Sequence, residues 1–307
     1  FLASAITELV SIGVTKQATA EYAEQSMKME AQNRTTELNG WIACIEQSVN
    51  TLSDYVVGEL DADAFFADKA YADGFTEQIQ SIVNDFAVHT DGAISVYIRY
   101  NPEYSNPTSG CFFMRESLQE DFYTVEPTDF SMYEPTDYAH VGWYYLPVEN
   151  KQPLWMAPYL NENVNVYMIS YVVPIYAEDG TSIGIVGMDI NFDQVTNTVD
   201  AVNIYDSGYA FLTDANGVIM HHKDLEIGQN LSDLSGELGD IAAKISAGEG
   251  EGELLGYRYN NSNNQLIYAS LNNQMKFVLT APDKEIHATT NTLVVKTSTG
   301  GLAAIIF

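Results

Sequence analysis

The chain has 307 residues, enough for two domains or for one large domain. Hydrophobic residues make up 46% and charged residues 18%, a composition typical of globular proteins. The net charge is −29, from 42 acidic and 13 basic residues, so the surface repels phosphate backbones and argues against a nucleic-acid partner. The same charge either attracts cationic ligands over long distances or serves only to keep the protein soluble.

Both ends of the chain are apolar, opening with FLASAITELVSIGV and closing with TGGLAAIIF. Neither stretch reaches the ~20 residues that cross a bilayer, and neither has the basic region and cleavage site of a signal peptide. We expect both to be parts of membrane-spanning helices, with the residues between them forming a loop between two membrane spans.

Residues 1–58 are predicted to form one long helix. No proline occurs before Pro102, and apolar residues recur at the three-and-four spacing of a buried stripe. A helix of this length is typical of a spine along which other units are arranged, and a coiled-coil segment of a dimeric receptor shows the same pattern. The stripe consists of Leu38, Trp41, Ile42, Ile45, Val49, Leu52, Tyr55 and Val56.

A first strand-rich unit follows this helix. β-Branched and aromatic residues predict its strands, and the turn Glu178-Asp179-Gly180 joins two of them as a hairpin. Residues 118–142 carry acids, aromatics and prolines with only weak periodicity. The predicted elements are a helix at 75–87, strands at 93–100, 110–117, 164–177 and 181–191, and a helix at 192–202.

A second, smaller unit repeats the pattern. Its first two strands flank the turn Ala215-Asn216-Gly217, for which the Asn-Gly pair predicts type I′ geometry. Because consecutive hairpins dominate both units, the predicted fold class is α+β, with mainly antiparallel sheets flanked by helices. The predicted elements are strands at 207–214, 218–223, 250–259, 266–271 and 276–283, a helix at 237–248, and a closing helix.

The order and spacing of these segments resemble the double Cache (dCache) family of extracytoplasmic sensor domains. The likeness covers nearly the whole chain and includes the long first helix. The other segments that carry it are GWYYLP (142–147), QPLWMAPYLN (152–161), GIVGMDI (184–190) and SGYAFLTDANGVIMHHKD (207–224).

The resemblance implies two tandem PAS-like Cache modules in the sensing part of a chemoreceptor, sensor histidine kinase or diguanylate cyclase. It places a ligand pocket in the membrane-distal module and implies no chemistry in the segment itself. A homodimeric receptor anchored by flanking transmembrane helices is expected on the same ground. The domain boundaries are then a helix at 1–58, the membrane-distal module at 59–200, the membrane-proximal module at 201–287 and a helix leading to the membrane at 288–307.

Many amino-acid-binding members of this family share a motif in the distal module. It has an Arg two residues before a Trp-Tyr pair, a later Tyr, and an Asp in the last strand. Trp143-Tyr144 resembles the pair, Tyr159 resembles the later Tyr, and Asp189 resembles the Asp. The resemblance therefore implies that these four residues bind the ligand.

The chain departs from this motif at the Arg position, which holds Val141. Tyr138 lies near an earlier family Tyr, although with a different spacing, and Arg99 is a substitute for the Arg if its side chain faces the pocket. The segment from Glu116 to His222 holds 16 acidic residues against one basic residue, Lys151. The full set of candidate ligand-binding residues is Trp143, Tyr144, Tyr159, Asp189, Tyr138 and Arg99.

The chemistry of this set favours a cationic ligand. A carboxylate such as Asp189 accepts charge-assisted hydrogen bonds from an ammonium, and aromatic rings can surround the cation. An α-carboxylate would need a basic partner, so an amine fits better than an amino acid. The alternative is structural: aromatic clusters are more often core than binding cage, and Asp189 could bond to loop backbone instead.

Other kinds of site are weakly supported. Cys44 and Cys111 form either a disulfide or two free thiols, with no zinc spacing. His221-His222 is not a metal pair in a strand, because adjacent residues point to opposite faces. No cofactor or catalytic role is expected, since no hydrolase, metalloprotease, phosphate-loop or dinucleotide motif occurs. An exported hydrolase with paired carboxylates and a structural dimerisation stalk remain as alternatives.

Overall fold

The structure is a computed structural model that describes residues 2–161, 166–234, 236–259, 261–286 and 288. It divides the chain into two compact units. The central unit is Gly40–Val195, and the flanking unit is Phe1–Asn39 together with Thr196–Phe307. The helix predicted over 288–307 lies outside the described residues, apart from residue 288.

The predicted long helix is confirmed as α1 (Leu2–Glu59), which is continuous over 58 residues. Its apolar stripe is buried, with Ile42, Ile45 and Val49 at most 1% exposed. The boundary between the two units falls within this helix, at residues 39 and 40, so the helix contributes to both units. None of the described helices is both long and apolar enough to span a membrane.

The described part of the central unit is built on a seven-stranded antiparallel sheet. The strand order is β3-β2-β1-β7-β6-β4, with β5 paired to β6. The predicted hairpin forms β6 and β7, and β1 pairs with the other edge of β7. The strands are β1 (Ala93–Tyr100), β2 (Gly110–Met114), β3 (Tyr123–Thr124), β4 (Leu154–Trp155), β5 (Tyr159–Asn161), β6 (Val166–Tyr176) and β7 (Ser182–Asn191).

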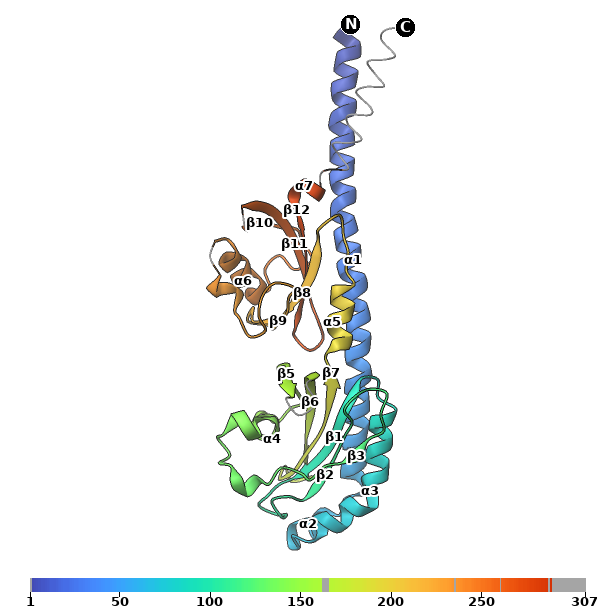
Figure 1. The fold of residues 1–307 in the computed structure, drawn as a ribbon, viewed down its shortest axis with the longest axis vertical. Helices are drawn as coiled ribbons and strands as arrows, with labels where there is room; N and C mark the ends of the chain where they lie inside the picture. Colours follow the sequence, from blue (N-terminus) through green and yellow to red (C-terminus); the bar gives the residue numbers. More distant parts are fainter. Residues whose placement is uncertain (1, 162–165, 235, 260, 287, 289–307) are drawn as a thin grey trace. The chain divides into compact units, whose positions relative to one another are not determined.

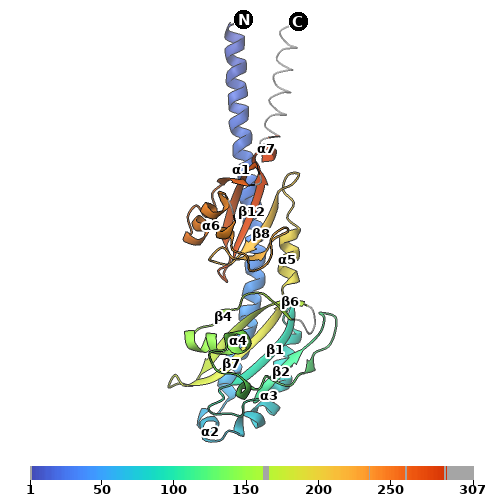
Figure 2. The ribbon, with the colours of Figure 1, turned by 60° about the vertical axis from the view of Figure 1, so that its left-hand side comes forward.

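Helices cover both faces of this sheet, which buries all eight residues of β1. On one face, the Thr76 hydroxyl of α3 (Tyr71–Val88) donates to the Tyr100 hydroxyl at 3.2 Å. Residues two apart share a face, so the side chains of Ser95 and Tyr97 point to the other face. That face is covered by α4 (Tyr138–Asn150), and Figures 1 and 2 show α3 and α4 on opposite sides of the sheet.

The sequence did not predict α4. The helix contains Pro147, and the side chain of Asp137 at its N-terminus makes no capping bond to it. A proline and a run of aromatic residues both weaken a helical prediction. Packing compensates, because Val141, Gly142, Tyr144 and Pro147 are buried against the sheet. The short helix α2 (Ala62–Ala67) was also not predicted.

The flanking unit contains a five-stranded antiparallel sheet in the order β10-β11-β12-β8-β9. The predicted helix is present as α6 (Leu238–Ala247), and its Ile241 and Ile245 pack into the core of this unit. Figure 2 shows α6 beside the sheet. The strands are β8 (Tyr209–Thr213), β9 (Ile219–His221), β10 (Leu255–Tyr259), β11 (Ser262–Ser270) and β12 (Lys276–Pro282), and α5 (Asp193–Asp200) precedes them.

The turn between β8 and β9 is not the predicted type I′ turn. That geometry needs a positive φ at both central residues, whereas here Gly217 has a φ of 79° and Asn216 does not have a positive φ. The Asp214 carboxylate accepts hydrogen bonds from the backbone N–H of Asn216 and Val218, both at 2.8 Å. These bonds stabilise a three-residue loop with glycine in the left-handed region, and a bulge follows in the strand pairing.

The two cysteines are both free thiols. Cys44 is exposed on α1 and Cys111 is buried in β2, where burial raises the pKa of its thiol to about 12. The disulfide alternative is therefore wrong.

Candidate functional site

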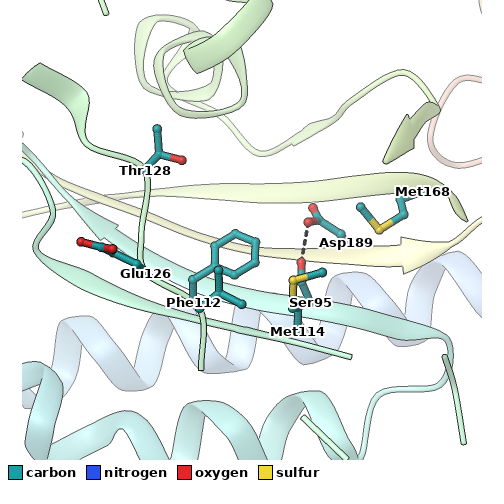
Figure 3. A pocket seen from close by; sticks show the side chains of 8 residues that line it. Ser95, Phe112, Met114, Glu126, Thr128, Met168 and Asp189 are labelled. Atoms are coloured by element: carbon teal, nitrogen blue, oxygen red, sulfur yellow. Dashed lines mark hydrogen bonds between the residues drawn. The ribbon is translucent and has the colours of Figure 1, made fainter. Parts of the chain in front are cut away.

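A cavity of about 510 Å³ lies on the α4 face of the central unit. A smaller cavity of about 140 Å³ shares Phe112, Thr128 and Asp189 with it. Figure 3 shows the Phe112 ring between Asp189 and the segment that carries Glu126 and Thr128. The larger cavity is lined by Tyr97, Phe112, Thr128, Tyr138, Ala139, His140, Trp143, Met156, Ala157, Tyr159, Ser170 and Asp189.

Asp189 sits on β7, between two serines. Strand register places Ser95 of β1 and Ser170 of β6 directly opposite it on the neighbouring strands. The Ser95 hydroxyl donates to Asp189 Oδ2, and the Ser170 hydroxyl donates to Asp189 Oδ1 at 2.7 Å. The carboxylate is 4% exposed, and burial raises its pKa while the hydroxyl donors act in the opposite direction.

Tyr97 adds a third hydroxyl donor, at 3.2 Å from Asp189 Oδ1. Its ring lies across Gly187, where a Cβ would come within 2.7 Å of the Tyr97 hydroxyl oxygen and closer still to the ring. A glycine two residues before Asp189 therefore leaves the space that lets Tyr97 reach the carboxylate. Burial, followed by the charge of Asp189, raises the pKa of Tyr97, so this hydroxyl stays protonated and remains a donor.

Aromatic rings form the wall beside the carboxylate. The rings of Tyr97 and Phe112 are stacked, with centroids 5.3 Å apart and an interplanar angle of 7°. The Trp143 ring meets Tyr97 edge-on, at 5.4 Å and 75°. The three rings line the larger cavity next to Asp189, and their different orientations expose both ring faces and ring edges to it.

Two further tyrosines stand at the larger cavity. Tyr159 on β5 is 41% exposed and lines the cavity, and burial of its hydroxyl, followed by the charge of Asp189, raises the pKa of Tyr159. Tyr138, at the first residue of α4, is 45% exposed and donates to Glu149 Oε2 at 2.9 Å. Of the residues predicted from sequence, the structure therefore brings Trp143, Tyr159, Asp189 and Tyr138 to one cavity.

Tyr144 and Arg99 do not line either cavity. Tyr144 is 2% exposed and belongs to the core cluster that also holds Val141. It points into the core because α4 turns Trp143 and Tyr144 in different directions, about 100° apart. Val141, at the position where the family motif has an Arg, also packs in this core and does not line the cavity.

Arg99 supports the cavity from outside its lining. Its Nη2 donates to the backbone carbonyls of Pro107 and Thr128 at 2.8 and 2.7 Å, and its Nε donates to the Ser109 carbonyl at 3.2 Å. The guanidinium lies 4.2 Å from the centre of the Phe130 ring, and burial lowers its pKa to about 10. Arg99 lies four residues beyond Ser95, about 13 Å away along the same face of β1. Its bond to the Thr128 carbonyl holds the segment that brings Thr128 to the cavity.

His140 is the one basic side chain among the described residues that line the two cavities. Its Nδ1 lies 2.9 Å from Asp137 Oδ2, and its ring stacks on Tyr133 at 4.9 Å. His140 was not among the predicted site residues, because the helix that directs its side chain was not predicted. The Asp137 carboxylate engages Nδ1 and offsets the positive charge that a protonated His140 would present to an acidic group, which makes His140 a weaker anchor than an unpaired base.

The paired histidines of the flanking unit are each engaged separately. His221 Nε2 lies 2.7 Å from Asp200 Oδ1. His222 Nδ1 accepts from the backbone N–H of Asp224 and Leu225, and burial lowers its pKa to about 4. Within the part of the chain that the structure describes, no group of three His, Cys, Asp or Glu side chains could hold a metal.

The family model of the Cache domain in its dCache_1 form matches residues 15–290. The chain belongs to the Cache domain family. A curated relative, the methyl-accepting chemotaxis protein PctB of Pseudomonas aeruginosa, is 28% identical over 136 residues, which are 44% of this chain and 21% of PctB. The stretch shared with this Cache chain is thus about a fifth of that receptor's length.

Solved structures show the same fold. The extracellular domain of mmHK1S-Z2, described in its name as a histidine kinase, has a TM-score of 0.66 and 21% identity, covering 86% of this chain and 98% of that one. The ligand-binding domain of the Campylobacter jejuni chemoreceptor Tlp3, in complex with L-valine, has a TM-score of 0.63 and 16% identity, covering 89% and 98%. The predicted α+β Cache fold is therefore confirmed, and the chain is a Cache sensor domain of the kind found in chemoreceptors and histidine kinases.

Proposed function

We propose that this Cache domain is the extracytoplasmic sensor of a transmembrane receptor and binds a small organic cation in the larger cavity of the central unit. The observation that carries the proposal is Asp189, a buried carboxylate that opens onto a cavity walled by aromatic rings. A volume of about 510 Å³ falls in the range of small-molecule sites. The net charge of −29 would steer a cation towards it.

An amine fits this cavity better than an amino acid. Its described lining contains no lysine or arginine, and His140 is already paired with Asp137. Arg99 donates from Nε and Nη2 to backbone carbonyls, and its remaining nitrogen Nη1 is buried outside the lining of the cavity, so it offers no fork to a ligand carboxylate there. A carboxylate buried here without a partner would be costly. We therefore propose the amine as the ligand class, with Trp143, Tyr159, Tyr138 and Asp189 as contact residues.

An amino acid is the second candidate, and a solved neighbour favours it. Tlp3 is named as a chemoreceptor bound to L-valine, so a domain of this fold accommodates such a ligand in that protein. A sequence identity of 16% supports a shared fold, and it is too low to assign the ligand of Tlp3 to this chain. If this chain binds an amino acid, His140 replaces Arg99 as the first side chain to examine for carboxylate contact.

We also propose that the complete protein is a membrane-anchored homodimer. PctB is named as a methyl-accepting chemotaxis protein, which is a receptor class, and α1 has the length of a dimerising receptor helix. The hydrolase and the plain stalk are the competing functions. Among the described residues, Asp189 is the one carboxylate that lines the larger cavity, and in the smaller cavity the Phe112 ring lies between Asp189 and Glu126. This arrangement does not favour paired-carboxylate catalysis.

Calorimetric titration with one matched pair tests the ligand class. Isobutylamine is L-valine without its carboxylate, so the two differ only in the group for which the cavity offers no unpaired basic partner. We expect isobutylamine to bind at least about 10-fold more tightly, because it avoids an unpaired buried carboxylate. Tighter binding of L-valine would show that the amine proposal is wrong. A screen of amines, amino acids and carboxylates without any rise in melting temperature would favour the stalk, and consumption of a ligand would favour the enzyme.

A further inference from the structure

We infer that the cavity is built for a methylated ammonium group and not for a primary ammonium that donates N–H bonds. This inference rests on the proposed function, because it specifies the cation that the same site accepts. It follows from two features of the site: the hydrogen-bonding capacity left on Asp189, and the chemistry of the surfaces that face it.

Three hydroxyl donors already occupy most of the hydrogen-bonding capacity of the Asp189 carboxylate. The Ser95 hydroxyl donates to Oδ2, while Ser170 and Tyr97 donate to Oδ1 at 2.7 and 3.2 Å. Tyr159 lines the same cavity as this carboxylate. A carboxylate has about four lone-pair positions, so three donors leave about one position for the three N–H groups of a primary ammonium.

Displacing these donors would carry a cost. Ser95 and Ser170 are each 1% exposed, so a hydroxyl that lost Asp189 to a bound ligand would have little access to water. A buried donor without an acceptor is destabilising, and a primary ammonium could place more than about one of its three N–H groups on Asp189 only by creating this defect. The three N–H groups of such a ligand would also leave water for a space whose walls are mainly carbon.

A methylated ammonium avoids both problems. It has the same charge, which Asp189 attracts without a hydrogen bond, and its methyl groups bury well against carbon. The stacked pair of Tyr97 and Phe112 and the perpendicular Trp143 supply π surfaces around one space. Such surfaces attract a diffuse cation most strongly when it is desolvated, as it would be here. Met156 and Ala157 line the same cavity and suit an alkyl chain.

The test is calorimetric titration of the whole chain with isobutylamine and its N-methyl, N,N-dimethyl and N,N,N-trimethyl derivatives at neutral pH. All four are cations, so only the number of N–H groups and methyl groups changes. We expect affinity to rise with each methyl group and to differ about 10-fold or more between the two ends of the series. Equal or tighter binding of isobutylamine would overturn the inference and leave the proposed function standing. Failure of all four to bind would overturn both.

Ser170→Ala provides a second, independent readout. It removes one hydroxyl donor, which frees a lone pair on Asp189 for an N–H group. The preference for the trimethyl compound over isobutylamine should therefore shrink by about 3-fold or more in this variant. Ser95→Ala should reduce the same preference, because it frees a lone pair on the other carboxylate oxygen, Oδ2. This variant replaces Ser170→Ala in the test if Ser170→Ala does not fold. An unchanged preference in a folded variant would contradict the role of donor saturation.

Discussion

Replacing Asp189 by asparagine is expected to weaken binding of isobutylamine or its trimethyl derivative about 10- to 150-fold. The two side chains have nearly the same shape, so the change removes the buried charge while the aromatic walls stay in place. Calorimetric titration measures the loss. Asp121→Asn is the matched control, because it removes one exposed charge from the same acidic segment and should change affinity by less than about 2-fold.

The pH dependence of binding should identify the same group. Burial raises the pKa of Asp189, so acidification protonates this carboxylate before exposed ones and removes its attraction for the cation. Affinity for the trimethyl compound, which keeps its charge at every pH, is therefore expected to fall as the pH is lowered. Asp189→Asn should lose this dependence. Wild-type affinity that does not change with acidification would contradict the assignment of Asp189 as the cation partner.

Replacing Arg99 by methionine is expected to destabilise the central unit by about 2–4 kcal/mol. The change keeps much of the side-chain volume but leaves the carbonyls of Ser109 and Thr128 without their donor, while Pro107 keeps only the backbone N–H of Phe130. It also removes the cation from the Phe130 ring. Chemical denaturation followed by tryptophan fluorescence measures the loss, since all three tryptophans lie in the central unit.

Two controls distinguish the structural role of Arg99 from direct contact between Arg99 and the ligand. Arg258→Met removes an exposed arginine and should change stability by less than about 0.5 kcal/mol. In any folded fraction of Arg99→Met, the preference for isobutylamine over L-valine should persist, because Arg99 does not line the cavity. Loss of that preference without loss of stability would mean that Arg99 contacts the ligand directly.

The sequence predicted the fold well where local patterns agree with packing. The long helix and the hairpin of β6 and β7 follow from a regular apolar stripe and from a turn between β-branched runs. It failed at α4, where a proline and several aromatic residues conceal a helix that tertiary packing stabilises. It also failed at Asn216, where the Asp214 carboxylate selects a different turn.

The candidate site was predicted only in part, for a geometric reason. The family motif led to Trp143, Tyr159 and Asp189, which do line the cavity, and to Tyr144, which α4 turns into the core. Ser95 and Ser170 were missed because their role depends on strand register, which pairs them with Asp189 across two different strands. Tyr97 was missed because its position depends on the space above Gly187. Once the pairing of β1, β6 and β7 is known, all three residues could be identified.

The central claim is that a small cation enters the cavity beside Trp143, and the fluorescence of Trp143 tests it most directly. Trp41 and Trp155 lie 6.3 Å apart and do not line the cavity, so replacing both by phenylalanine leaves Trp143 as the one tryptophan of the chain. Titrating this variant with the trimethyl derivative of isobutylamine should give a saturable change in emission. Its midpoint should match the calorimetric dissociation constant, and Asp189→Asn should abolish the change at the same concentrations. Calorimetric binding that leaves the Trp143 emission unchanged and survives Asp189→Asn would contradict the claim.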